Sequence, residues 1–151
     1  MHCSPRRAGM TPTETLVLAA VFAGAALFVF FRFHGNSGED ARATTIERMN
    51  AVMEGLENYA IDNAADFPTT DQGLKALLAR PKIEPVPRNW RGPYVDDPQS
   101  IYDAWDMPLH YVSPGGKSPE YDLWSNGADN REGGRDADAD IQSWDPATMS
   151  P

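Results

Sequence analysis

Cysteine is almost absent from this sequence of 151 residues, and Cys3 is the only one. A single cysteine excludes an intramolecular disulfide and a zinc site built from cysteines. Histidine is also scarce, and His2, His34 and His110 are too scattered to form a recognisable metal motif. Basic residues are few as well: 13 Lys and Arg stand against 22 Asp and Glu, a formal net charge of −9. This balance argues against a nucleic-acid-binding protein, which needs a basic face.

One long apolar run interrupts this otherwise polar composition. Residues 15–31, TLVLAAVFAGAALFVFF, contain no charged side chain. A helix of this length spans about 26 Å, near the lower limit for crossing the hydrocarbon core of a bilayer. Arg6 and Arg7 precede the run, so the positive-inside rule predicts residues 1–9 in the cytoplasm and the body of the chain beyond the membrane. A secretory signal peptide is disfavoured, because no A-x-A-like site follows the run and Glu14 stands at its entrance.

The start of the chain resembles the leader of type IV prepilins. In that pattern Gly9 is the last leader residue, Met10 the first mature residue and Glu14 the fifth. The resemblance implies cleavage by prepilin peptidase between Gly9 and Met10 and N-methylation of Met10. It also implies that Glu14 serves assembly by pairing with the N-terminal amine of a neighbouring subunit, since a carboxylate in lipid gains most from a buried ammonium. Pro12 and Thr13 stand where the prepilin pattern usually has an apolar pair.

A break and then a second helical pattern follow the apolar run. Residues 34–38, HGNSG, predict a hinge after a helix over residues 10–33, and Ser37 is one of two N-cap candidates there. Residues 39–151 predict one globular domain, whose amphipathic first helix runs to about Asn63. The apolar residues at helical spacing are Ile46, Met49, Val52, Met53, Leu56 and Tyr59. We interpret this stripe as the side of the helix that faces a core, not as a ligand groove.

Shorter elements are expected after this helix. Leucines at positions 74, 77 and 78 predict a short helix that ends at Pro81. Five prolines within residues 81–100 predict a long surface loop without regular structure. The expected strands are residues 109–112, 121–124 and 141–144. The turn sequence at residues 113–116, SPGG, joins the first two strands in a hairpin.

The C-terminal part of the chain is strongly acidic. Residues 126–145 contain Asp129, Glu132, Asp136, Asp138, Asp140 and Asp145, with two arginines. Carboxylates in a glycine-rich loop repel one another unless a hard cation lies between them, and calcium takes six to eight oxygen ligands. An EF-hand beginning at Asp136 fails, because Ile141 would stand where glycine is needed and Ala147 where the bidentate Glu belongs. Composition alone leaves a calcium site and a solvated acidic loop both open.

Five ordered blocks from Tyr59 onward resemble the major pseudopilin, the G subunit, of type II secretion systems. They are YAIDN (59–63) with FPTTDQGLKAL (67–77), RNWRGPY (88–94), YVSPG (111–115), YDLWSNGAD (121–129), and GG (133–134) with ADIQSW (139–144). With the leader, the resemblance covers nearly the whole chain. The pattern departs at residues 103–108, which read DAWDMP where the family usually has DPWGNP.

This resemblance implies a fold and a metal site. The implied fold is α+β and pilin-like: a long N-terminal transmembrane and amphipathic helix, a small antiparallel β-sheet and a calcium-binding C-terminal loop. The family binds one Ca²⁺ in this loop, which stabilises the globular domain. Carried over by position, Asp129 and Asp140 provide side-chain ligands, with Asp138 as the third and Asp136 as its competitor. Asn126 and Arg131 would contribute backbone carbonyls.

The resemblance also implies a structural function and no enzymatic activity. The chain is expected to be a single-pass protein of the bacterial inner membrane, with a cytoplasmic N-terminus and a periplasmic globular domain. Its N-terminal helices would form a homopolymer, the periplasmic pseudopilus, which helps export folded proteins across the outer membrane. The implied partners are the prepilin peptidase, the minor pseudopilins and the inner-membrane secretion platform. ATP would be used by a separate motor, since the sequence has no phosphate-binding loop.

Three alternatives compete with this interpretation. A minor pseudopilin or a type IV pilin shares the leader, but the block at residues 69–78 and the acidic segment favour the major pseudopilin. A membrane-anchored periplasmic calcium-binding module that never polymerises would show the same acidic loop. A membrane-anchored hydrolase could use paired carboxylates such as Asp136 and Asp138, but the sequence contains nothing like a nucleophile elbow, a metal-hydrolase motif or a cofactor loop.

Overall fold

The computed structural model describes residue 22 and residues 37–150. The chain divides into two units, Met1–Ser37 and Gly38–Pro151. The predicted leader, the cleavage site at Gly9 and Met10, and Glu14 lie outside the described residues, as does nearly all of the predicted apolar helix. Among the residues that are described, no helix combines the length and the apolar character needed to cross a bilayer.

The globular unit is organised on one long helix, α2 (Ser37–Asp62). Its 26 residues correspond to about 39 Å of helix. Glu39 and Asp40 lie in the first turn, where negative charge is favourable to the helix dipole. The predicted core-facing stripe is confirmed: Ile46, Met49, Val52, Leu56 and Tyr59 are buried, and Met53 packs against them.

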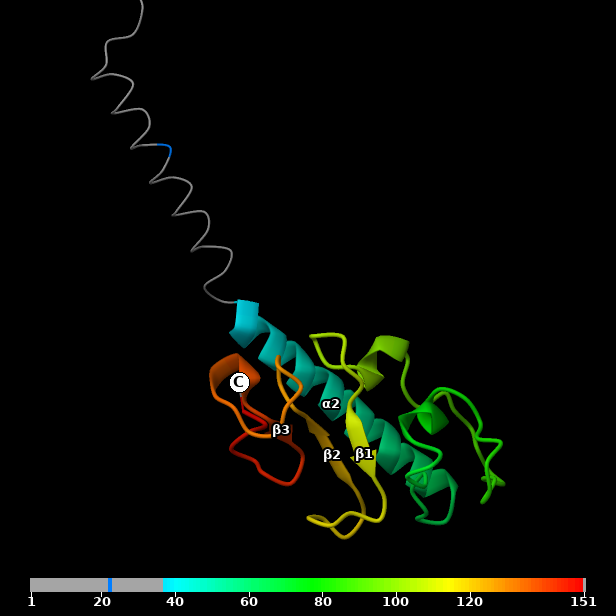
Figure 1. The fold of residues 1–151 in the computed structure, drawn as a ribbon. Helices are drawn as coiled ribbons and strands as arrows, with labels where there is room; N and C mark the ends of the chain where they lie inside the picture. Colours follow the sequence, from blue (N-terminus) through cyan, green and yellow to red (C-terminus); the bar gives the residue numbers. More distant parts are fainter. Residues whose placement is uncertain (1–21, 23–36, 151) are drawn as a thin grey trace, which may run out of the picture. The chain divides into compact units, whose positions relative to one another are not determined.

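A small antiparallel sheet provides the other side of the core (Figure 1). Its strands are β1 (His110–Val112), β2 (Asp122–Ser125) and β3 (Ile141–Gln142), in the order β1-β2-β3. Leu123 and Ile141 are completely buried and belong to the same apolar cluster as the stripe of α2. The three strands were expected at these places, but β1 and β3 are shorter than predicted and β2 is shifted by one residue. Leu109, for example, donates its backbone N–H to the carbonyl of Ile101 rather than to a sheet neighbour.

The segment between α2 and the sheet contains two single-turn 3-10 helices, η1 (Leu74–Leu77) and η2 (Pro98–Ile101). The first confirms the predicted short helix. The second corrects the prediction of an irregular surface loop over residues 81–100. At the end of this range the chain forms a helical turn, η2, in which Ser100 and Ile101 are buried. The reason is local: the Asp97 side chain accepts from the backbone N–H of Gln99, and Pro98 stands at the first helical position, where its missing N–H costs nothing.

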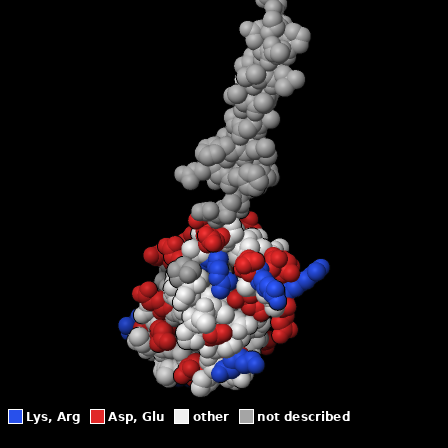
Figure 2. Space-filling view, turned by 90° about the vertical axis from the view of Figure 1, so that its left-hand side faces the viewer, with Lys and Arg blue, Asp and Glu red and all other residues white. Residues whose placement is uncertain are grey.

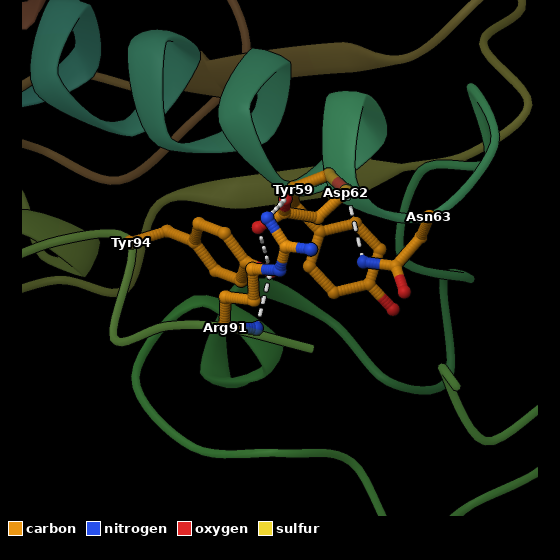
Figure 3. Close-up of polar contacts among 5 residues, drawn as sticks. All are labelled: Tyr59, Asp62, Asn63, Arg91 and Tyr94. Carbon is orange, nitrogen blue, oxygen red and sulfur yellow. Dashed lines mark hydrogen bonds and ion pairs between the residues drawn. The ribbon is translucent and has the colours of Figure 1, made fainter. Parts of the chain in front are cut away.

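The C-terminal end of α2 is held to the segment that follows η1 (Figure 3). The Tyr94 hydroxyl donates a 3.0 Å hydrogen bond to the carboxylate of Asp62, and Arg91 lies 3.6 Å from the same carboxylate. Tyr59 and Tyr94 meet edge to face, with ring centroids 5.5 Å apart. Burial, and then the neighbouring Asp62, raise the pKa of Tyr94 above its ordinary value. The exposed Arg91 adds little by comparison.

Candidate functional site

The candidate site is the connection between β2 and β3, residues 126–140, which we call the acidic loop. Figure 1 shows it in orange beside the beginning of α2. A short 3-10 helix, η3 (Asp136–Asp138), forms part of it. The backbone N–H of Ala128 donates a 3.0 Å hydrogen bond to the carbonyl of Ala137, so the two arms of the loop meet. This segment therefore folds back on itself and is not an extended tail.

Two glycines allow this fold. Gly127 has a φ of +66°, and a Cβ atom there would lie 2.7 Å from the carbonyl oxygen of Asp138. Gly134 has a φ of +92°, and a Cβ atom there would also collide with the Asp138 carbonyl. Any other residue would be strained at both places, because a side chain would have to enter space that the backbone occupies. The glycines therefore bring both arms of the loop against Asp138.

The loop carboxylates differ in their surroundings. Asp129 is exposed and accepts a 3.1 Å hydrogen bond from the backbone N–H of Arg131. Asp140 is half-buried, and its two oxygens lie 3.1 and 3.0 Å from the backbone nitrogen of Gly133. Asp136 and Asp138 are exposed. Two of the predicted ligands thus bond to backbone amides of the loop itself.

The fold places the predicted ligands on one folded loop but does not gather their carboxylates at a single point. Within residues 37–150 no group of three or more His, Cys, Asp or Glu side chains is gathered as a metal site. The only ion pair in that range joins Arg91 to Asp62, so Arg131 and Arg135 do not neutralise the loop carboxylates at ion-pair distance. The donor set is oxygen alone, from carboxylates and carbonyls, which is the set that calcium takes. The residue types therefore fit a hard cation, although their carboxylates do not converge on one point.

The remaining carbonyl candidate, Asn126, lines a hollow beside the sheet. Its side-chain nitrogen is 3.3 Å from the ring nitrogen Nε2 of His110, which stacks on Trp124 with ring centroids 4.9 Å apart. The hollow has a volume of about 470 Å³, and Asn126 and Asp140 both line it. Asn126 is thus positioned by β1 and β2, on the opposite arm of the loop from Asp140.

Sequence reasoning missed three residues that hold the loop. Arg42 of α2 donates to the carbonyls of Ala139 (3.1 Å) and Thr148 (2.7 Å). Ser125 accepts a 3.2 Å hydrogen bond from the backbone N–H of Gly127, and its hydroxyl donates at 2.7 Å to Asp103. Arg42 and Asp103 gave no local signal, because their partners are distant in the sequence.

The surface around the loop is predominantly acidic. Figure 2 displays the side of the globular unit on which the acidic loop lies in Figure 1, and carboxylates there outnumber lysines and arginines. This distribution agrees with the net charge of −9. It favours cations over anions as ligands of this face.

A long helix packed on a small antiparallel sheet defines a pilin-like fold. The structure is similar to the crystal structure of the major pseudopilin from the type 2 secretion system of enterohaemorrhagic Escherichia coli. The TM-score is 0.59 at 32% sequence identity, with 73% of this chain and 91% of that chain covered. The family model for type II secretion system protein G matches residues 32–144, and the chain belongs to that family.

Relatives support the same assignment over nearly the whole length. The chain is 36% identical to the type II secretion system core protein G of Pseudomonas aeruginosa, with 93% of this chain and 96% of the relative covered. It is 35% identical to the core protein G of Vibrio cholerae, with 92% of each covered. The core protein G of Aeromonas hydrophila is 33% identical, with 92% of this chain and 93% of the relative covered. The resemblance found in the sequence is confirmed.

Proposed function

We propose that this chain is a structural subunit of the pseudopilus, the periplasmic filament of the type II secretion system, and that it has no catalytic role. The carrying observation is membership of the protein G family together with the fold it shares with a major pseudopilin. A filament needs heterologous, non-closing contacts between identical subunits. Assembly of the filament beneath an outer-membrane channel would help export folded proteins.

The N-terminal residues would provide membrane storage and assembly. The basic leader and the uncharged run at residues 15–31 support a single-pass topology in the inner membrane, with the globular unit in the periplasm. Prepilin peptidase would cut between Gly9 and Met10, and Met10 would be methylated. Glu14 would pair with the amine of the next copy as N-terminal helices pack together. Minor pseudopilins and the inner-membrane platform would be the further partners.

The test of this function uses the source bacterium, from which the native gene is deleted and to which each variant is supplied in its place. Replacing Glu14 with alanine should leave cleavage at Met10 intact, because the peptidase site is unchanged. Secretion of folded proteins into the medium should fall to the level of the deletion strain, because filaments fail to form. Gly9→Val is the matched variant, since it should block cleavage instead. Normal secretion by both variants contradicts the proposal.

We further propose that the acidic loop holds one Ca²⁺. Asp129, Asp140 and either Asp138 or Asp136 would provide side-chain oxygens, and Asn126 and Arg131 would provide backbone carbonyls. The bound ion would supply the positive charge that offsets repulsion among these carboxylates. Because the folded loop brings its two arms together through Ala128 and Ala137, a ligand of both arms would stabilise the folded state by mass action.

Thermal unfolding of the full chain in detergent micelles tests the ion site. Calcium at a hundred times its Kd should stabilise the wild type by about 2.7 kcal/mol relative to excess chelator. Asp129→Asn and Asp140→Asn should each remove most of that difference. Asp71→Asn is the control, because Asp71 is an exposed carboxylate outside the loop. A wild-type melt that is identical with calcium and with chelator refutes the site.

A further inference from the structure

We propose that Arg42 couples the acidic loop to the first turns of α2, so that cation binding in the loop and the order of the beginning of the helix depend on each other. This inference rests on the proposed cation site. It adds Arg42 as a positioning residue, and it implies that residues 38–46 become more ordered when the cation binds. The argument depends only on contacts within the globular unit.

The first contact is made by the guanidinium of Arg42. Its Nη1 donates to the carbonyl of Ala139 at 3.1 Å, and its Nη2 donates to the carbonyl of Thr148 at 2.7 Å. Ala139 lies between Asp138 and Asp140, two of the proposed side-chain ligands. Arg42 thus fixes the stretch of backbone from which both carboxylates project, and it holds that stretch to α2 across 97 positions of sequence.

The second contact is made one turn earlier on the same face of the helix. A Cβ atom at Gly38 would lie 3.0 Å from the Cβ of Ala137, which is closer than ordinary contact. A larger residue at position 38 would crowd Ala137, so glycine permits the close approach of η3 to the helix. Residues four apart lie one above the other on a helix. Gly38 and Ala137, then Arg42 and Ala139, therefore form two successive contacts between α2 and the acidic loop.

These contacts fall where a helix is weakest. The first four N–H groups of a helix have no partner within the helix, and helix ends open more readily than their centres. Any ligand that holds the loop closed will therefore hold the first turns of α2 as well. By thermodynamic reciprocity, an ordered start of α2 will tighten cation binding by the same factor.

The charge of Arg42 does not remove the ligands of the site. Its guanidinium bonds to carbonyl oxygens, and no ion pair within residues 37–150 involves it. The carboxylates of Asp138 and Asp140 therefore remain available for a cation. Arg42 acts on the loop through its backbone and is not itself a ligand.

Hydrogen exchange of the full chain in detergent micelles, with Ca²⁺ and with chelator, tests the coupling. In the wild type, Ca²⁺ should slow amide exchange across residues 38–46. Arg42→Ala should abolish this slowing and raise the Kd for Ca²⁺, measured by calorimetry, about fivefold or more. Arg80→Ala is the matched control, because Arg80 also donates to a backbone carbonyl, that of Pro87, which lies outside the loop and its supports. It should retain both the slowing and the wild-type Kd.

Each outcome has one meaning. If the wild type binds Ca²⁺ but Arg42→Ala shows the same slowing and the same Kd, the coupling is refuted while the cation site stands. If calorimetry detects no Ca²⁺ binding to the wild type, the cation site is refuted and the coupling with it. Should Arg42→Ala fail to fold, Arg42→Lys replaces it, since an ammonium lacks the planar fork that reaches both carbonyls. Arg42→Lys should then show the weaker binding.

Discussion

The carboxylate of Asp103 accepts a 2.7 Å hydrogen bond from the hydroxyl of Ser125, although the two residues stand 22 positions apart in the sequence. Both are only 1% exposed. Asp103 also accepts from the backbone N–H groups of Trp105 and Met107, and Ser125 accepts from that of Gly127. The buried pair of Asp103 and Ser125 thereby fixes the point at which the chain enters the acidic loop.

Removal of the Asp103 carboxylate should be strongly destabilising. Asp103→Ala leaves the buried Ser125 hydroxyl and two part-buried backbone N–H groups without their acceptor, and an unsatisfied buried group costs about 1–3 kcal/mol. We expect the free energy of unfolding in urea to fall by about 2–4 kcal/mol. Asp97→Ala is the control, because exposed Asp97 accepts from an amide two residues later in the same way. Equal losses in the two variants would contradict the role of the buried network.

The end of α2 offers a stabilising substitution. Ala64 and Ala65 have φ values of +61° and +69°, and the N–H of Ala65 donates at 2.8 Å to the carbonyl of Ala60. This arrangement is the helix end that normally takes glycine. Ala64→Gly should therefore raise the free energy of unfolding by about 0.5–1 kcal/mol, because it removes left-handed strain.

A matched substitution inside the helix should have the opposite effect. Ala43 is exposed and lies within α2, so Ala43→Gly should lower the free energy of unfolding by about 1 kcal/mol. Chemical unfolding of both variants gives the comparison. The same sign for both would show that strain at Ala64 does not matter.

Asp122 should make stability depend on pH in the acid range. Burial acts to raise the pKa of its carboxyl, but hydrogen bonds from the backbone N–H groups of Ser118, Gly116 and Lys117 outweigh burial and hold that pKa below its ordinary value. Because this pKa is lower in the folded state than in the unfolded state, the ionised carboxyl stabilises the fold at pH values above the unfolded pKa of about 3.8. This stabilisation is lost as the pH falls through the lower pKa of the folded state.

Asp122→Asn measures this contribution directly. At neutral pH the variant should be less stable than the wild type by about 1–3 kcal/mol, since an amide oxygen accepts the three bonds poorly. The difference between the two proteins should shrink steadily as the pH is lowered from 4 towards 2. Urea unfolding at a series of pH values provides the measurement. A difference that stays constant over this range would assign the loss to packing instead of charge.

Local patterns predicted the elements better than their connections. The stripe from Ile46 to Tyr59 predicted α2 because a core-facing helix must repeat apolar residues every three or four positions. The hairpin followed from the turn at residues 113–116. η2 was missed because the prolines around it are also typical of irregular loops, and Asp97 signals a helix start only in the presence of a suitable partner.

The sequence predicted which residues make up the acidic loop, but it did not predict the residues elsewhere in the chain that hold the loop in place. Its acids and glycines are contiguous in the sequence, and Gly127 and Gly134 do allow the close approach that such residues suggest. Arg42 and Asp103 could not be found in this way, because the folded chain alone brings them to Ala139 and Ser125. The predictions for Gly9, Met10 and Glu14 concern residues that the structure does not describe, and they stay predictions.

The outer strands of the sheet are unusually brief: β1 has three residues and β3 has two. A long free strand edge is a template on which another molecule can add its own strand, and such additions end in aggregates. Subunits crowded along a filament would meet this hazard continuously. Edges this short give a neighbouring copy almost nothing to extend, so adjoining domains remain separate bodies. Short edges of this kind therefore oppose the joining of neighbouring copies through a shared sheet.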